Sequence, residues 1–227
     1  MPAADSPDGP ASATFFGDGP LAADTELWLI RHGETEWSKS GQHTGRTDLP
    51  MTAHGERQAS ALRDMIGHLR PVLVLSSPRQ RAVRTAELAG LRIDDIDPDL
   101  VEWDYGAFEG LTTPQICQRV PGWSLWTHPV PDGETADEVS ARADRVLRRA
   151  AAHLADGPVV LIAHGHISRV IAARWIGLEA TGGGRFALGT AAPSVLGAQH
   201  GAPVIEHWNM PNPALTGQPE TGPRSAP

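Results

Sequence analysis

Three consecutive residues, Arg31, His32 and Gly33, bring together a cation, an imidazole and a backbone without a side chain. The guanidinium of Arg31 offers a planar set of donors that suits phosphate oxygens. The imidazole of His32 can act as a nucleophile, and Gly33 lets the backbone approach an oxyanion closely. They follow a short apolar run, residues 26–30, which is typical of a buried strand. This combination indicates covalent capture of a phosphoryl group.

A second histidine–glycine pair, His164 and Gly165, follows another apolar run, residues 158–163. Ligands of open parallel sheets bind beyond the carboxyl ends of the strands. Helix N-termini that begin there attract anions through their free N–H groups and their dipoles. We therefore expect His32 and His164 to lie at one site, although they are far apart in the chain.

The arginines of residues 79–84 form a third group of residues that could take part in catalysis or binding. Ser77 and Pro78 predict a helix start, with the serine as N-cap and the proline at the first helical position. This helix would bring Arg81 to the same sheet edge as the two histidines. Arg79 and Arg84 are interpreted as surface or structural residues.

Strand and helix patterns alternate between residues 25 and 209, which predicts a single α/β domain. We expect a three-layer α/β/α sandwich with a mostly parallel central sheet. The expected strands are residues 26–30, 72–75, 158–163, 194–199 and 204–208. The expected helices are residues 53–69, 77–88, 135–154 and a segment from 164 to 176. Two end segments are rich in Pro, Gly and Ala. We predict that residues 1–24 form a disordered N-terminal tail and that residues 210–227 form a flexible C-terminal tail.

Composition narrows the classes of function. The formal net charge of −8 argues against nucleic-acid binding as the main activity. No apolar run approaches the roughly 18 residues that a membrane span needs. Cys117 is the only cysteine, which excludes an internal disulfide and fits a reducing cytoplasm. These features indicate a cytoplasmic enzyme whose anionic ligand must bind in a locally positive site.

Five motifs in order resemble the histidine phosphatase (phosphoglycerate-mutase-like) superfamily, over roughly residues 26–208. They are Arg31-His32-Gly33, residues 81–86, residues 102–106, residues 108–110 and His164-Gly165. The run of residues 36–45 resembles mycobacterial-type acid phosphatases and fungal sedoheptulose-1,7-bisphosphatases. The resemblance therefore implies a phosphoglycerate-mutase-like fold and a phosphomonoesterase that hydrolyses a small phosphorylated metabolite.

The resemblance also implies the catalytic roles. His32 would attack phosphorus and form a phosphohistidine, while Arg31, Arg81 and His164 would hold the three equatorial oxygens. His32 must be neutral to attack, whereas His164 would help most as a cation. Glu102 would protonate the leaving alkoxide and then deprotonate the attacking water. No metal and no cofactor are expected.

Other site residues remain open at this point. Asp104 or Glu109 is an alternative to Glu102 as the acid. His166 follows His164 by two positions and raises the question of a metal site, but no cysteine or carboxylate cluster accompanies the pair. The residues expected to contact substrate are Gly33, Ser38, Lys39, Thr44, Gly45, Trp103, Tyr105, Gly165 and His166.

Two alternative functions fit the sequence less well. A cofactor-dependent phosphoglycerate mutase would carry an arginine pair that binds the substrate carboxylate, but Leu111 to Gly133 contains only Arg119. A catalytically silent binding module is disfavoured because all five catalytic positions hold competent residues. We expect sugar phosphates to be preferred over phosphoglycerates. The expected partner is a small phosphorylated metabolite rather than nucleic acid or membrane, and a homodimer stays open.

Overall fold

The computed structural model describes residues 20–213. Most of the two predicted tails, residues 1–19 and 214–227, lies outside the described residues. Within them, Asn212 is fully buried. Its amide donates to the carbonyl oxygens of Gln58 at 2.9 Å and Ala191 at 2.8 Å. The packed chain therefore extends at least to Asn212, beyond residue 209, where the sequence analysis ended the domain.

The centre of the fold is a six-stranded mixed sheet with the order β3-β2-β4-β1-β5-β6. Strand β1 pairs in parallel with β4, which pairs in parallel with β2, and β2 pairs in parallel with β3. The hairpin of β5 and β6 adds two antiparallel pairs beside β1. The strands are β1 (Leu27–Arg31), β2 (Leu73–Ser76), β3 (Asp95–Ile96), β4 (Val159–Ala163), β5 (Pro193–Gln199) and β6 (Ala202–His207).

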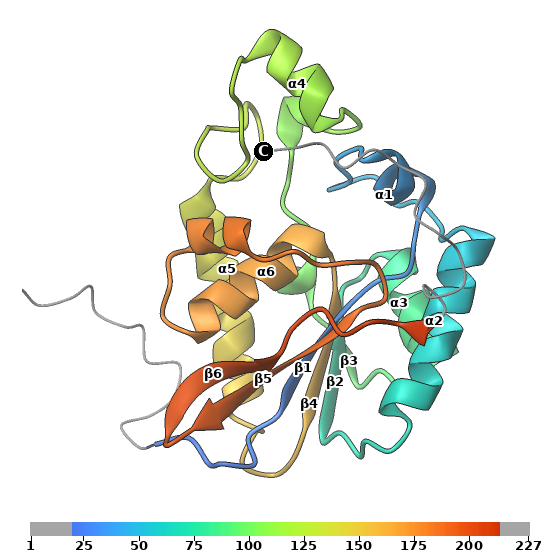
Figure 1. The fold of residues 1–227 in the computed structure, drawn as a ribbon, viewed down its shortest axis with the longest axis vertical. Coiled ribbons are helices and arrows are strands. Elements are labelled where there is room, and N and C mark those ends of the chain that lie inside the picture. The colour runs from blue at the N-terminus through green and yellow to red at the C-terminus, as the bar shows by residue number, and fades with distance from the viewer. Residues whose placement is uncertain (1–19, 214–227) are drawn as a thin grey trace, which may run out of the picture.

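Helices cover both faces of this sheet, which confirms the predicted three-layer sandwich (Figure 1). The helices are α1 (Glu36–Ser40), α2 (Ala53–Ile66), α3 (Gln80–Ala89), α4 (Thr113–Arg119), α5 (Ala136–Ala151) and α6 (Gly165–Trp175). Helices α2 and α3 lie on one face, and α5 and α6 lie on the other. Short 3₁₀ turns span Pro98–Leu100, Gly106–Phe108 and Ala180–Arg185.

The alternation of side chains along the buried strands produces two separate cores. In β1, Leu27 and Leu29 join the core beneath α5 and α6, whereas Trp28 and Ile30 join the core beneath α2 and α3. The same alternation divides β4 between the two cores. Because both faces are covered, β1 and β4 read as continuous apolar runs, as buried parallel strands do.

The start of α3 differs from the prediction. The helix begins at Gln80 with Arg79 as N-cap, and Arg79 makes no side-chain capping bond. Asp48, on the loop after α1, accepts a hydrogen bond from the N–H of Gln80 at 3.0 Å. A carboxylate distant in sequence thus caps the helix, so the Ser77-Pro78 signal placed its start too early.

Three arginines on α5 hold the segment that leads into the Glu102 region. The guanidinium of Arg142 is mostly buried and binds both carboxylate oxygens of Glu134, at 2.7 and 2.8 Å. It also donates to the carbonyl oxygen of Val101 at 3.0 Å. Further along the helix, Arg145 pairs with Asp99, and Arg149 pairs with Asp95 in β3.

None of the helices within residues 20–213 is long and apolar enough to cross a membrane.

Candidate active site

The two histidines meet at the carboxyl edge of the sheet, as predicted. His32 directly follows β1, and His164 directly follows β4, where it is the N-cap of α6. Because β1 and β4 are parallel neighbours, their ends lie side by side. The ring centroids are 5.1 Å apart, and both side chains are buried.

The hydrogen bonds of His32 determine its tautomer. Its Nδ1 lies 2.7 Å from the carbonyl oxygen of Gly33. A carbonyl oxygen can only accept, so Nδ1 carries the proton and Nε2 keeps a free lone pair. Burial lowers the pKa of His32 well below its ordinary value, and the charges of Arg81 and Arg31 lower it further. His32 is therefore a neutral imidazole, as a nucleophile requires.

His164 is neutral as well, which corrects the expectation of an imidazolium. The Nε of Arg81 donates to Nδ1 of His164 at 3.2 Å. Because Nδ1 accepts, Nε2 carries the proton and donates to the hydroxyl of Ser77 at 2.7 Å. Burial lowers the pKa of His164 well below its ordinary value, and the charge of Arg81 contributes next. Positive charge in this part of the site resides on arginine.

Arg81 is fully buried, and its guanidinium is oriented by three acceptors. Besides His164, its Nη1 donates to the carbonyl oxygen of Thr47 at 2.9 Å, and its Nη2 donates to that of Thr44 at 3.3 Å. Arg31 also lies close enough for its charge to act on His164, and its Nη1 donates to the carbonyl oxygen of Leu188 at 2.6 Å. A Cβ on Gly165 would lie 3.3 Å from Arg31 Cζ, so this glycine leaves room for the guanidinium.

Glu102 is buried at the N-terminus of α6. Its Oε1 accepts hydrogen bonds from the N–H groups of Trp103 and Ile167, each at 2.9 Å. Its Oε2 accepts from the N–H of His166, also at 2.9 Å. Burial lowers the pKa of Arg31 and of Arg81, and the charge of Glu102 opposes this shift in both, so the carboxylate lies close to these cations. The structure thus places Glu102 with the predicted catalytic residues.

The two alternative acids, Asp104 and Glu109, accept hydrogen bonds from backbone N–H groups of nearby loops. Asp104 forms an ion pair with Arg46 and accepts a hydrogen bond from the N–H of Gly106 at 3.0 Å. Glu109 accepts hydrogen bonds from the N–H groups of Gly45 and Thr47. Glu102 also accepts backbone hydrogen bonds, but its charge acts on both Arg31 and Arg81, and this proximity to the two cations favours Glu102 as the acid.

Tyr105 and His166 form a buried polar pair beside Glu102. The Tyr105 hydroxyl oxygen lies 2.6 Å from Nδ1 of His166, and this Nδ1 lies 3.8 Å from Oε2 of Glu102. Burial, reinforced by the charge of Glu102, raises the pKa of Tyr105 well above its ordinary value, so the phenol keeps its proton. The imidazole of His43 packs on Tyr105 with a centroid distance of 4.7 Å. Among the residues expected to contact substrate, His166 and Trp103 each donate a backbone N–H to Glu102 at 2.9 Å.

Several other predicted contacts have structural partners. Ser38 forms a capping box with Thr35 at the start of α1, and Lys39 in the same helix is exposed. Trp103 is buried, and its indole N–H donates to the carbonyl oxygen of Glu134 at 2.9 Å. The N–H of Gly33 donates to the hydroxyl of Thr85 at 3.1 Å.

Gly33 is required by packing against α2. A Cβ on Gly33 would lie 2.4 Å from the carbonyl oxygen of Gly55, a distance that no side chain tolerates. The N–H group that was expected to face an oxyanion already binds Thr85. The contacts of Gly33 therefore point to close approach of β1 and α2 rather than to ligand binding.

Sequence reasoning missed two contributors to the site. The sequence predicts Ser77 only as a helix cap, whereas its hydroxyl accepts a hydrogen bond from Nε2 of His164 at 2.7 Å as well as one from the N–H of Arg79 at 3.4 Å. Its position directly after β2, at the same sheet edge as the two histidines, was an available signal. Thr47 contributes only a backbone carbonyl oxygen to Arg81, and no side-chain pattern signals that role.

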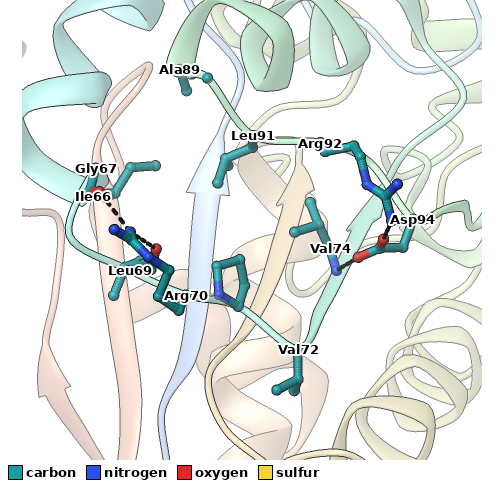
Figure 2. Close-up of a pocket in the computed structure, with 12 residues that line it drawn as sticks. Ile66, Gly67, Leu69, Arg70, Val72, Val74, Ala89, Leu91, Arg92 and Asp94 are labelled. Atoms are coloured by element: carbon teal, nitrogen blue, oxygen red, sulfur yellow. Dashed lines mark hydrogen bonds and ion pairs between the residues drawn. The ribbon is translucent and has the colours of Figure 1, made fainter.

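A separate hollow lies near the beginning of β2, between the C-terminal ends of α2 and α3 (Figure 2). Its two arginines already have protein acceptors. Arg70 donates to the carbonyl oxygens of Gly67 and Leu69, and Arg92 pairs with Asp94. The hollow is therefore distinct from the histidine site and offers no comparable cluster of buried cations.

Lowered histidine pKa values predict how stability depends on pH. Burial is the main cause that lowers the pKa of His32, His164 and His166. In the unfolded chain each imidazole would bind a proton near pH 6.5, whereas in the folded protein these three imidazoles stay neutral at that pH. The free energy of unfolding should therefore fall as the pH decreases below about 6.5. Each extra proton bound by the unfolded state adds a slope of about 1.4 kcal/mol per pH unit.

Urea unfolding in phosphate-free buffers between about pH 7.5 and pH 5 measures this slope. The window lies above the pKa of ordinary carboxyl groups, so the histidines dominate the change. A free energy of unfolding that is constant or rises toward pH 5 would contradict the neutral assignment.

Comparisons with known proteins agree with this geometry. A family model described as the histidine phosphatase superfamily (branch 1) matches residues 27–211. The acid phosphatase of Mycobacterium tuberculosis is 41% identical over 196 residues, which cover 86% of this chain and 94% of that protein. The sedoheptulose 1,7-bisphosphatase of Saccharomyces cerevisiae is 34% identical over 181 residues, which cover 66% of this chain and 67% of that protein.

A solved structure, that of an open reading frame product of Mycobacterium tuberculosis, has the same fold. It superposes with a TM-score of 0.80 at 41% identity, and the match covers 82% of this chain and 98% of that one. The family model, which matches residues 27–211, spans the sheet and the elements that carry His32, Arg81 and His164.

Proposed function

The chain belongs to the histidine phosphatase superfamily and is a phosphatase, and we propose that it hydrolyses sugar phosphates through a phosphohistidine formed on His32. One observation carries the proposal. The free Nε2 of a buried, neutral His32 lies beside His164, whose ring is fixed by Arg81. This places a nucleophile next to groups that can stabilise negative charge on a phosphoryl group.

In the proposed first step, Nε2 of His32 attacks phosphorus, a P–N bond forms and the P–O bond to the leaving group breaks. Arg81 gives three of the five guanidinium N–H groups to protein acceptors, so two remain for phosphoryl oxygens. Arg31 would bind a further oxygen, and His164, which accepts from Arg81 and donates to Ser77, would hold the Arg81 guanidinium in place. Glu102 in its acid form would donate its proton to the leaving alkoxide.

In the second step, Glu102 would take a proton from water, and the resulting hydroxide would attack the phosphohistidine. The P–N bond breaks, inorganic phosphate leaves and Glu102 regains its acid form. Each turnover thus uses one water and returns both residues to their starting protonation. The sequence of steps needs no metal or organic cofactor.

A preference for sugar phosphates is supported by the segment of residues 111–133. Its only arginine is Arg119, so it lacks an arginine pair that could bind the carboxylate of a phosphoglycerate. Polar residues occur instead from the end of α1 into the loop that follows it, residues 38–46, among them Lys39, Gln42, Thr44 and Arg46. The relative named sedoheptulose 1,7-bisphosphatase, which acts on a sugar bisphosphate, supports the same substrate class.

The test compares kcat/KM for sugar bisphosphates, hexose monophosphates and 3-phosphoglycerate at one pH. We expect the sugar phosphates to be preferred, because a polar site matched to hydroxyl groups rejects substrates that leave its own groups unpaired. Inclusion of EDTA should not change the rates, and vanadate should inhibit. A preference for 3-phosphoglycerate, or its conversion to 2-phosphoglycerate, would favour the mutase alternative. Equal rates on all substrates would leave a phosphatase of broad specificity.

We also propose a cytoplasmic location, which the single Cys117 supports because it suits a reducing compartment. A homodimer remains a proposal that light scattering on the purified chain can test.

A further inference from the structure

A short loop after α1 supplies the backbone acceptors of Arg81. The carbonyl oxygens of Thr44 and Thr47 accept from Nη2 and Nη1 of the guanidinium, at 3.3 and 2.9 Å. These two bonds, with the one to His164, set the plane and rotation of a side chain that is fully buried. The position of residues 44–47 therefore decides how Arg81 presents its remaining N–H groups.

Glu109 holds the same loop through its N–H groups. Oε1 accepts from Gly45 N at 3.0 Å and from Thr47 N at 2.9 Å, and Oε2 accepts from Gly45 N at 2.9 Å. The loop thus directs its carbonyl oxygens to the guanidinium and its N–H groups to the carboxylate. Within residues 44–47, Thr47 bonds to both groups, through its oxygen and its nitrogen.

Gly45 allows this close packing. A Cβ at position 45 would lie 2.6 Å from the carbonyl oxygen of Trp103 and 3.0 Å from Oε2 of Glu109. Any side chain here would push the loop away from the carboxylate. The adjoining segments are also tied together, since His43 N donates to Leu111 O and Gly110 N donates to His43 O, each at 2.9 Å.

We infer that Glu109 is a positioning residue that fixes Arg81 for phosphoryl binding through the loop of residues 44–47. The inference rests on the proposed role of Arg81 in the phosphatase reaction. Glu109 acts through hydrogen-bond acceptance rather than through its charge, because one oxygen, Oε1, already accepts from both Gly45 and Thr47. A glutamine could therefore retain both bonds, whereas a methionine of similar size could retain neither.

The test compares Glu109→Met and Glu109→Gln with the wild-type chain. Calorimetric titration with inorganic phosphate reports the affinity of the site without turnover, and hydrolysis of p-nitrophenyl phosphate reports kcat/KM. We expect Glu109→Met to bind phosphate about tenfold more weakly and to lose about 10²-fold in kcat/KM. Glu109→Gln keeps Oε1 as acceptor but places an amide nitrogen where Oε2 accepts from Gly45 N, so it should lose much less than Glu109→Met in both measurements. Glu87→Met, on the exposed side of α3, is the matched control.

Two results would overturn the inference. One is a Glu109→Met protein that melts at a lower temperature but binds phosphate as tightly as wild type, which would make Glu109 merely structural. The other is a Glu109→Gln protein as impaired as Glu109→Met, which would make the charge decisive. A wild-type chain that binds phosphate but hydrolyses no ester would contradict the proposed function alone, and the binding comparison would still decide the role of Glu109.

Discussion

His32→Ala should release no measurable phosphate and form no phosphoenzyme. The substitution removes the imidazole whose Nε2 lies beside the Arg81–His164 pair, and alanine offers no nucleophile in its place. Loss of a nucleophile from a catalytic unit costs about 10⁴-fold or more in kcat. Rapid quenching with radiolabelled substrate measures the phosphoenzyme directly, and steady-state release of phosphate measures turnover.

His153→Ala is the matched control for this experiment, since His153 is exposed near the end of α5. It should keep wild-type turnover and phosphoenzyme levels. Because His32 is buried, the melting temperature of His32→Ala must show that the variant is folded. A burst of covalent phosphorylation in folded His32→Ala would assign the nucleophile to another residue, with His164 as the first candidate.

Glu102→Gln should impair hydrolysis of alkyl phosphates far more than hydrolysis of p-nitrophenyl phosphate. An alkoxide needs a proton as it leaves, whereas p-nitrophenolate is stable without one. We expect a loss of about 10²–10⁴-fold in kcat for the alkyl ester, the usual contribution of a general acid. Parallel kinetics on the two esters with one enzyme preparation measure the difference.

The leaving-group comparison also separates chemistry from structural damage. In Glu102→Gln the new amide group would face at least one of the three backbone N–H groups that the carboxylate accepts, so some loss of positioning is expected. Such damage lowers both rates equally. Asp104→Asn serves as the control, because Asp104 bonds Arg46 and Gly106 instead. Equal losses on both esters would refute the acid role of Glu102.

The fold could be predicted from the sequence because its core strands and helices produce recognisable patterns over short stretches of the chain. The apolar runs at β1 and β4 are continuous, and each ends directly at a histidine, so strand position and site position were predicted together. The capping box of Thr135 and Glu138 marked the start of α5 correctly. By contrast, α1, α4 and the two-residue strand β3 are too short to produce a period, and none of them was predicted.

The details of the site depend on contacts between distant segments. The acceptors of Arg81 at Thr47 and Thr44 lie 34 and 37 positions away in the chain and are backbone atoms. No residue type at those positions signals the role. The neutral state of His164 likewise follows from its burial and from the donor at Arg81, neither of which a single sequence reveals. The residue types therefore predicted that the two histidines and Arg81 lie together, but they did not predict the protonation state of His164.

The two borders of the central sheet affect how the protein behaves when it is concentrated or refolded. An open strand edge can pair with a second chain and start aggregation. Here β3 has only two residues, and its Asp95 is paired with Arg149. At the opposite border, β6 carries Pro203, which has no N–H to donate, and the charged Glu206. Both borders therefore disfavour the addition of a further strand, which should let the folded chain stay dispersed at high concentration.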